Sequence, residues 1–216
     1  MGLNSVINRF ISLICHQQTL RCFEIGDKTL PLCTRCTGIY AGFLIAYLFL
    51  WIISAKKRIL RLSKNVIIVS LLMLFVFITD SLFSFKGILD LGNNIKFLFG
   101  LLGGASLGSF AFGILNYSLR EKSYFANIYF SLKDFVYLII VILVLFFLKL
   151  LFNYSFLFYF WKILSTLGLL FTYITVNFTL ITVFWQGKYD TKFKKQSILY
   201  TFLLIIIEFF IIKLIR

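Results

Sequence analysis

The sequence predicts an all-α integral membrane protein, a polytopic bundle of about six transmembrane helices behind an N-terminal Cys/His-containing leader. Three observations support this fold class. Of the 216 residues, 61% are hydrophobic and 14% are charged, which leaves too little polar surface to cover a water-soluble globule. Several apolar runs approach the ~20 residues that a helix needs to cross the hydrocarbon core. A single proline is available to break a helix.

The leader, residues 1–36, is amphipathic and interrupted by polar residues. Val6, Phe10 and Ile14 belong to a set of apolar residues at helical spacing, which predicts a helix lying on the membrane surface, followed by a loop. The predicted organisation is therefore an interfacial leader and a transmembrane bundle, residues 37–216, which together form one domain.

Six apolar segments are predicted to cross the membrane, because each is long enough and charged clusters or polar loops separate them. An aromatic-rich stretch before the fifth segment, residues 153–162, is predicted to lie in the interface between lipid and water. The predicted crossings are 37–54, 66–85, 96–118, 135–152, 163–185 and 197–214.

The distribution of Lys and Arg between these segments predicts the orientation. The loops after the first, third and fifth crossings carry about twice as many cations as the other loops and the C-terminal tail. Cytoplasmic loops carry such an excess, so a multi-pass protein of the cell membrane with both termini outside the cytoplasm is expected. The net charge of +14 then belongs to loops that contact anionic lipid, and no separate basic domain suggests nucleic-acid binding.

Glycines recur every fourth residue in two of the predicted crossings. Gly38 and Gly42 lie in the first, and Gly100, Gly104 and Gly108 lie in the third. Small residues at this spacing share one helix face and allow helix backbones to approach closely in lipid. Close packing of the bundle is the favoured explanation, and a substrate groove is the alternative.

All four cysteines and the only histidine precede the first crossing. Cys33 and Cys36 have the two-residue gap found in zinc sites and in dithiol redox pairs. Cys22 and one of Cys15 or His16 would complete a tetrahedral zinc site, the preferred explanation, because the number and softness of the ligands match zinc. Thiol exchange or a disulfide in an oxidising compartment is the second explanation, and packing as small hydrophobic residues is the third.

Alternating topology brings polar residues of three crossings to one side of the bilayer. Asp80, near the end of the second crossing, is a candidate catalytic acid, because charged groups at such positions usually pair or line a cavity. An ion pair with Arg35 or Lys96 that ties helices together is an equal alternative. Arg21 and Arg35 are candidate catalytic cations that suit an anionic group. The other predicted pocket residues are Gln17, Tyr40, Asn93, Asn94 and Lys96.

Two blocks of the sequence carry these residues in a recognisable order. CHQ begins at Cys15 and is followed by Arg21 and by PLCTRCTGIYAG from Pro31. Asp80 is followed by GNNIKFLFGLLGG from Gly92. Over roughly the first half of the chain, this order resembles the prokaryotic membrane family called domain of unknown function 2085. The resemblance implies no particular reaction, but it implies a site made of Cys15, His16, Arg21, Cys33, Arg35, Cys36, Asp80 and Asn94.

The chain departs from the family pattern at two positions. Ser81 follows Asp80 where the pattern has glycine, and Lys96 stands where the pattern has arginine. Lysine keeps the positive charge but lacks the planar guanidinium group, so a bidentate contact is not expected at Lys96.

The preferred functional hypothesis is a zinc-type Cys/His site above a polar pocket at one membrane face, acting on an anionic lipid headgroup or a small polar solute. The first alternative is a membrane thiol–disulfide oxidoreductase, in which Cys33 and Cys36 exchange electrons with a second pair and a quinone. The second alternative is a structural metal site in a transporter or scaffold subunit. Transport is less favoured, because no inverted repeat is apparent.

Overall fold

The computed structural model describes residues 22–25, 28–57, 61–87, 91–119, 129–151, 155–184 and 200–201. Its five long helices are α2 (Thr34–Lys57), α3 (Lys64–Phe85), α4 (Gly92–Leu119), α5 (Leu132–Leu151) and α6 (Ser155–Phe184). Its strands are β1 (Cys22–Ile25), β2 (Lys28–Cys33), β3 (Arg61–Leu62) and β4 (Tyr129–Phe130). β1 pairs with β2 in an antiparallel hairpin, and β3 pairs with β4 in parallel. The all-α character predicted for the bundle is confirmed.

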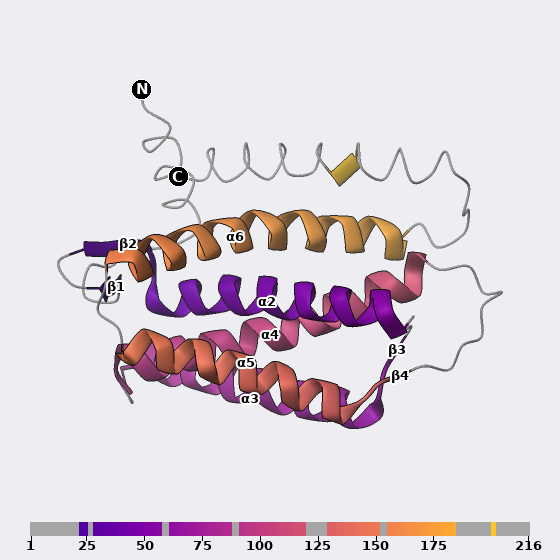
Figure 1. Cartoon of the computed structure of the whole chain (residues 1–216), viewed down its shortest axis with the longest axis horizontal. Coiled ribbons are helices and arrows are strands. Elements are labelled where there is room, and N and C mark those ends of the chain that lie inside the picture. Colours follow the sequence, from indigo (N-terminus) through magenta and orange to yellow (C-terminus); the bar gives the residue numbers. More distant parts are fainter. Residues whose placement is uncertain are drawn as a thin grey trace.

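The helices lie side by side, with α2 between α6 and α4 (Figure 1). α2, α4 and α6 run in one direction, and α3 and α5 run in the other. One end of the bundle therefore contains the starts of α2, α4 and α6 and the ends of α3 and α5. The β1–β2 hairpin lies at this end, which we call the hairpin end, and the β3–β4 pair lies at the opposite end.

Four of the described helices are long and apolar enough to cross a membrane, by length and composition. They contain most of the predicted first, second, third and fifth crossings. α5 coincides with the predicted fourth crossing and is not among the four, because too few of its residues are fully described for the same comparison. The sixth predicted crossing lies outside the described residues except for 200–201, so the number six stays a prediction. The four spans are Thr34–Ser54, Lys64–Phe85, Gly92–Asn116 and Phe158–Val183.

α3 has the residue distribution of a helix that faces lipid. It buries small or polar side chains, including Ser70, Asp80 and Ser84, against the bundle. Its large apolar side chains point outward, where contact with lipid is favourable and contact with water is unfavourable. The exposed set is Ile68, Leu71, Leu72, Phe75, Val76, Ile78, Leu82, Phe83 and Phe85. A helix on the surface of a water-soluble protein shows the opposite distribution.

The glycines of α2 and α4 bring the two backbones into direct contact. A Cβ atom at Gly38 would lie 2.5 Å from the Phe97 carbonyl oxygen, and one at Gly100 would lie 2.5 Å from the Arg35 carbonyl oxygen. Added Cβ atoms would also collide with backbone at Gly42, Gly104 and Gly108. These distances are too short for any side chain, so the structure confirms helix packing as the role of both glycine sets.

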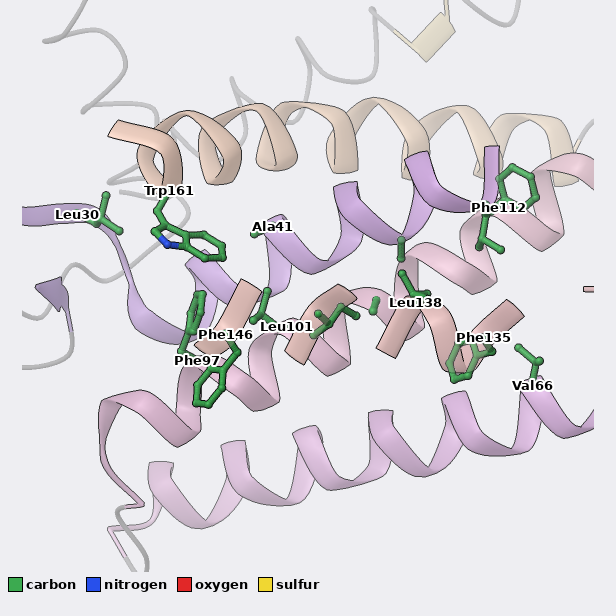
Figure 2. Close-up of a cluster of buried hydrophobic side chains, with 14 of the residues drawn as sticks. Leu30, Ala41, Val66, Phe97, Leu101, Phe112, Phe135, Leu138, Phe146 and Trp161 are labelled. Atoms are coloured by element: carbon green, nitrogen blue, oxygen red, sulfur yellow. The ribbon is translucent and has the colours of Figure 1, made fainter. Parts of the chain in front are cut away.

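The core at the hairpin end is aromatic (Figure 2). Trp161 of α6 is 0% exposed and meets Phe97 of α4 edge to face, with ring centroids 5.0 Å apart. Phe146 of α5 stacks on the other side of Phe97, and Leu30 of β2 joins the same buried cluster. Each aromatic pair adds about 0.5–1.5 kcal/mol beyond the area that it buries. The cluster therefore fixes the hairpin to α4, α5 and α6.

The predicted interfacial stretch at 153–162 belongs to α6 from Ser155 onward, with Trp161 fully buried by its neighbours and Tyr159 and Phe160 exposed. Its position at the interface stays a prediction. One prediction near this core is wrong. The loop predicted before the first crossing is, over residues 22–33, the β1–β2 hairpin, in which Leu30 and Leu32 point into the protein. The surface helix predicted before it lies outside the described residues.

Candidate functional site

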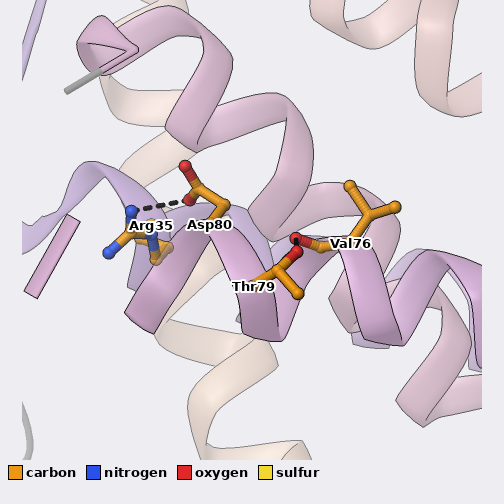
Figure 3. A network of polar contacts seen from close by, with 4 residues as sticks. All are labelled: Arg35, Val76, Thr79 and Asp80. Carbon is orange, nitrogen blue, oxygen red and sulfur yellow. Dashed lines mark hydrogen bonds and ion pairs between the residues drawn. The ribbon is translucent and has the colours of Figure 1, made fainter. Parts of the chain in front are cut away.

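An ion pair links α2 to α3 at the hairpin end (Figure 3). The Nη2 atom of Arg35 donates to Oδ2 of Asp80 over 2.6 Å, and the Asp80 side chain is only 4% exposed. Arg35 lies in the first turn of α2, and Asp80 lies near the end of α3, so antiparallel neighbouring helices bring them together. The structure confirms this pairing, which the sequence offered as one explanation for Asp80.

The ion pair leaves buried polar atoms beside it. Nε of Arg35 and Oγ of Ser81 are buried and have no hydrogen-bond partner within the described part of the chain. Ser81 stands where the resemblance led us to expect glycine, and it adds a hydroxyl group to this region. Buried polar atoms of this kind are commonly satisfied by ordered water or by a bound polar group.

Three cysteines lie in the β1–β2 hairpin and the first turn of α2, the turn that also carries Arg35. Cys22 and Cys33 are direct partners across the β1–β2 hairpin, and the Cys22 side chain is buried. α2 begins at Thr34, directly after Cys33, and therefore places Cys36 in its first turn. Cys33 and Cys36 pack, with Tyr40 and Tyr173, against one small cluster made of Leu32 and Leu169. The fold thus gathers both residues of the C-x-x-C sequence against the middle of α6, where Leu169 lies.

The start of α4 contributes polar residues to the same end. Lys149 of α5 donates a hydrogen bond to Oδ1 of Asn94, Lys96 is 4% exposed, and Asn93 is exposed. The pocket residues predicted from the sequence did not include Lys149. The sequence signal that could have identified Lys149 is a lone cation at the end of an apolar segment.

The predicted zinc site can be tested only in part. Within the described ranges, no three His, Cys, Asp or Glu side chains are placed so that they could hold a metal ion. Cys22, Cys33 and Cys36 therefore do not form a metal site by themselves. Cys15 and His16 lie outside the described residues, as do Gln17 and Arg21, so a zinc site that includes them stays a prediction.

Comparison with known proteins places the hairpin and the first three helices in a family. A family model described as "Predicted membrane protein (DUF2085)" matches residues 15–110, which span β1, β2, α2, α3 and most of α4. This range agrees with the extent of the resemblance seen in the sequence, which is thereby confirmed. No solved structure matches the chain.

Two archaeal proteins are similar over the same length of chain. An uncharacterized protein of Methanothermobacter thermautotrophicus is 32% identical over 94 residues, which cover 80% of that protein and 44% of this chain. An uncharacterized protein of Methanocaldococcus jannaschii is 31% identical over 93 residues, which cover 58% of that protein and 43% of this chain. Each alignment covers about as much of the chain as the family model, whose range of residues 15–110 includes the ion pair and the cysteines.

Proposed function

The chain belongs to the DUF2085 family of predicted membrane proteins, and from this premise we propose that it is a membrane thiol–disulfide oxidoreductase that uses Cys33 and Cys36. The observation that carries the proposal is the position of α2, which begins at Thr34 directly after Cys33. The amide groups at the start of a helix stabilise negative charge, which favours the reactive thiolate form of a cysteine there. C-x-x-C at the start of a helix is a typical arrangement of dithiol redox pairs.

The reaction is a two-electron exchange between dithiol and disulfide. The Cys33 thiolate attacks a substrate disulfide, forms a mixed disulfide and releases one substrate sulfur as a thiolate. The Cys36 thiolate then attacks the Cys33 sulfur and releases the second substrate sulfur. The protein ends with a Cys33–Cys36 disulfide, the substrate ends as a dithiol, and the two protons of the protein thiols pass to the released thiolates. The reverse exchange with another dithiol restores the starting state.

The environment of the pair supports this chemistry. Cys33 and Cys36 are partly exposed, so a substrate sulfur can approach them, and both contact the Leu32–Leu169 cluster. The predicted orientation puts the hairpin end outside the cytoplasm, where disulfides form and persist.

The hypothesis preferred from the sequence has less support. It requires a metal site, for which the described cysteines are not sufficient by themselves, and unpaired cations that would bind an anionic headgroup or a polar solute. Arg35 is one of those cations, but its charge is compensated by Asp80 at 2.6 Å. An ion-paired arginine offers less to an incoming anion than an uncompensated one does.

The test uses the full chain purified in detergent. The reduced protein is mixed with a fluorescently quenched glutathione disulfide, and the rate of reduction is measured. The unsubstituted protein should react at least about tenfold faster than Cys33→Ser, because the serine hydroxyl cannot replace a thiolate nucleophile. Cys36→Ser should accumulate the mixed disulfide on Cys33, and Thr79→Val, which keeps all four cysteines, serves as the control with an unchanged rate.

Metal analysis of the same preparation tests the competing zinc hypothesis. One tightly bound zinc per chain, together with no disulfide reduction until a chelator removes the metal, would overturn the oxidoreductase and support the zinc site.

A further inference from the structure

Cys22 lies directly opposite Cys33 in the antiparallel β1–β2 hairpin. We propose that Cys22 is a third redox residue, which attacks the Cys33–Cys36 disulfide and replaces Cys36 as the disulfide partner of Cys33. The inference rests on the proposed function for the Cys33–Cys36 pair and extends it to β1. It assigns a role to a cysteine that is absent from the C-x-x-C sequence.

The register of the hairpin satisfies the geometric requirement for a disulfide. Cross-strand partners in an antiparallel pair have Cα atoms about 4.5 or 5.5 Å apart, depending on the hydrogen-bonding pattern. Disulfides join residues whose Cα atoms are about 4.4–6.8 Å apart. Cys22 and Cys33 are such partners, so they can be bridged without a change in strand pairing.

An irregularity next to this pair gives the hairpin freedom to adjust. The register runs from Cys22 opposite Cys33 to Glu24 opposite Thr29. One residue of β1 therefore faces three residues of β2, and the three include Pro31, which has no N–H group to donate. Such bulges interrupt the hydrogen-bond ladder and redirect side chains. Small movements that align the two sulfur atoms therefore break few regular hydrogen bonds between the strands.

The three cysteines differ in burial, and this difference predicts the order in which they react. Cys22 is 8% exposed, whereas Cys33 and Cys36 are partly exposed. A bulky external disulfide can approach Cys33 more easily than Cys22. Cys22 is thus expected to react through Cys33, by exchange within the protein, and not directly with substrate.

The proposed step is balanced within the chain. The Cys22 thiolate attacks the Sγ atom of Cys33 in the Cys33–Cys36 disulfide. The Cys22–Cys33 bond forms, the Cys33–Cys36 bond breaks, and Cys36 leaves as a thiolate that takes up the proton lost by Cys22. No electrons enter or leave the protein, so the step requires no oxidant beyond the disulfide substrate that produced the first bond.

The test isolates the Cys22–Cys33 pair in the full-length protein. A variant with Cys15→Ser and Cys36→Ser is oxidised with glutathione disulfide, alkylated and mapped by mass spectrometry. A peptide pair linked through Cys22 and Cys33 is expected as the main product. If Cys22 remains alkylatable while Cys33 carries only glutathione, the inference is overturned.

A matched control moves the β1 thiol by two residues along the same strand. Cys22→Ser combined with Glu24→Cys places that thiol opposite Thr29 instead of Cys33. Its disulfide with Cys33 should form at least about tenfold less, because the Cα atoms are no longer cross-strand partners. An equal yield would show that the register does not direct the bond and would overturn the inference.

The unsubstituted protein separates this inference from the proposed function. Oxidation should yield both Cys33–Cys36 and Cys22–Cys33 linked peptides. If only the Cys22–Cys33 peptide is found from the earliest time of oxidation onward, its bond forms without a Cys33–Cys36 disulfide before it, and both the inference and the proposed function are overturned. The Cys33–Cys36 peptide alone would overturn the inference and leave the proposed function standing. Helical circular dichroism and a single size-exclusion peak for each variant show that the protein compared is folded.

Discussion

Arg35 and Asp80 form an ion pair of 2.6 Å that joins the first turn of α2 to the C-terminal part of α3. We expect Asp80→Asn to lower the free energy of unfolding by up to about 3 kcal/mol, because it leaves the charge of Arg35, whose side chain is 19% exposed, without compensation. Denaturant unfolding of the purified protein in detergent micelles, followed by circular dichroism, measures this loss.

Two further variants show whether the loss comes from the unpaired charge. Arg35→Gln combined with Asp80→Asn removes both charges and should lose less stability than Asp80→Asn alone. Thr79→Val is the matched control one residue away, since Thr79 only donates to the Val76 carbonyl oxygen of its own helix over 2.9 Å. It should change stability by less than about 0.5 kcal/mol. A double variant that loses as much stability as Asp80→Asn alone, or more, would contradict this account.

Gly104→Ala should destabilise the protein by about 1–3 kcal/mol, because a Cβ atom there collides with the backbone of Ile39. Gly113→Ala in the same helix is the control. A Cβ atom at Gly113 meets only the Leu62 side chain, at 3.1 Å, and alanine favours the helix by about 1 kcal/mol. Unfolding midpoints that fall equally for both variants would show that the α2–α4 backbone contact is not the cause.

Trp161→Ala should cost about 3–5 kcal/mol, since it removes a fully buried ring from the core at the hairpin end. Trp161→Phe should cost less than about 1.5 kcal/mol, because it keeps an aromatic ring. It also removes an indole N–H that is buried and has no hydrogen-bond partner among the described residues. If unfolding experiments show equal losses for both variants, the N–H group makes a stabilising bond.

The two ends of α3 should lie on opposite sides of the membrane. Lys64→Cys and Lys86→Cys mark its exposed start and the residue after its end, each in a background in which all four native cysteines are serine. A membrane-impermeant maleimide added to intact cells should label the cysteine at position 86, and the one at position 64 only after permeabilisation. Labelling of both positions from outside would show that α3 does not cross. The reverse pattern would leave the crossing intact and invert the predicted orientation.

The long helices were predictable because each is a continuous apolar run, and length alone identifies such runs in a membrane protein. The meeting of Arg35 with Asp80 followed from alternation, since consecutive antiparallel helices return the chain to the same end. The sequence could not choose between an ion pair and a catalytic acid for Asp80, because both roles require a charged residue near a helix end.

The β1–β2 hairpin was missed although a local signal exists. Gly26-Asp27 stands between the residues of the two strands, and such a dipeptide between short strand-forming runs is typical of a hairpin turn. The signal was obscured because cysteines, charged residues and Pro31 interrupt the alternation of apolar and polar residues. The burial of Trp161 was not predicted for a different reason. Aromatic clusters mark both membrane interfaces and buried cores, and only the packing of α4, α5 and β2 around it distinguishes them.

The contact between α2 and α4 restricts the movement of these two helices relative to each other. Backbone lies against backbone there, so rotation or sliding of either helix would force atoms into one another. α3 meets α4 differently, through the Phe77 side chain above Gly103, and a side chain can change rotamer. A displacement of α3 would carry Asp80 away from Arg35 while the turn with Cys33 and Cys36 stayed in place. The ion pair thus links the helix that carries Cys36 in its first turn to a helix whose contact with α4 is made by a side chain instead of by backbone.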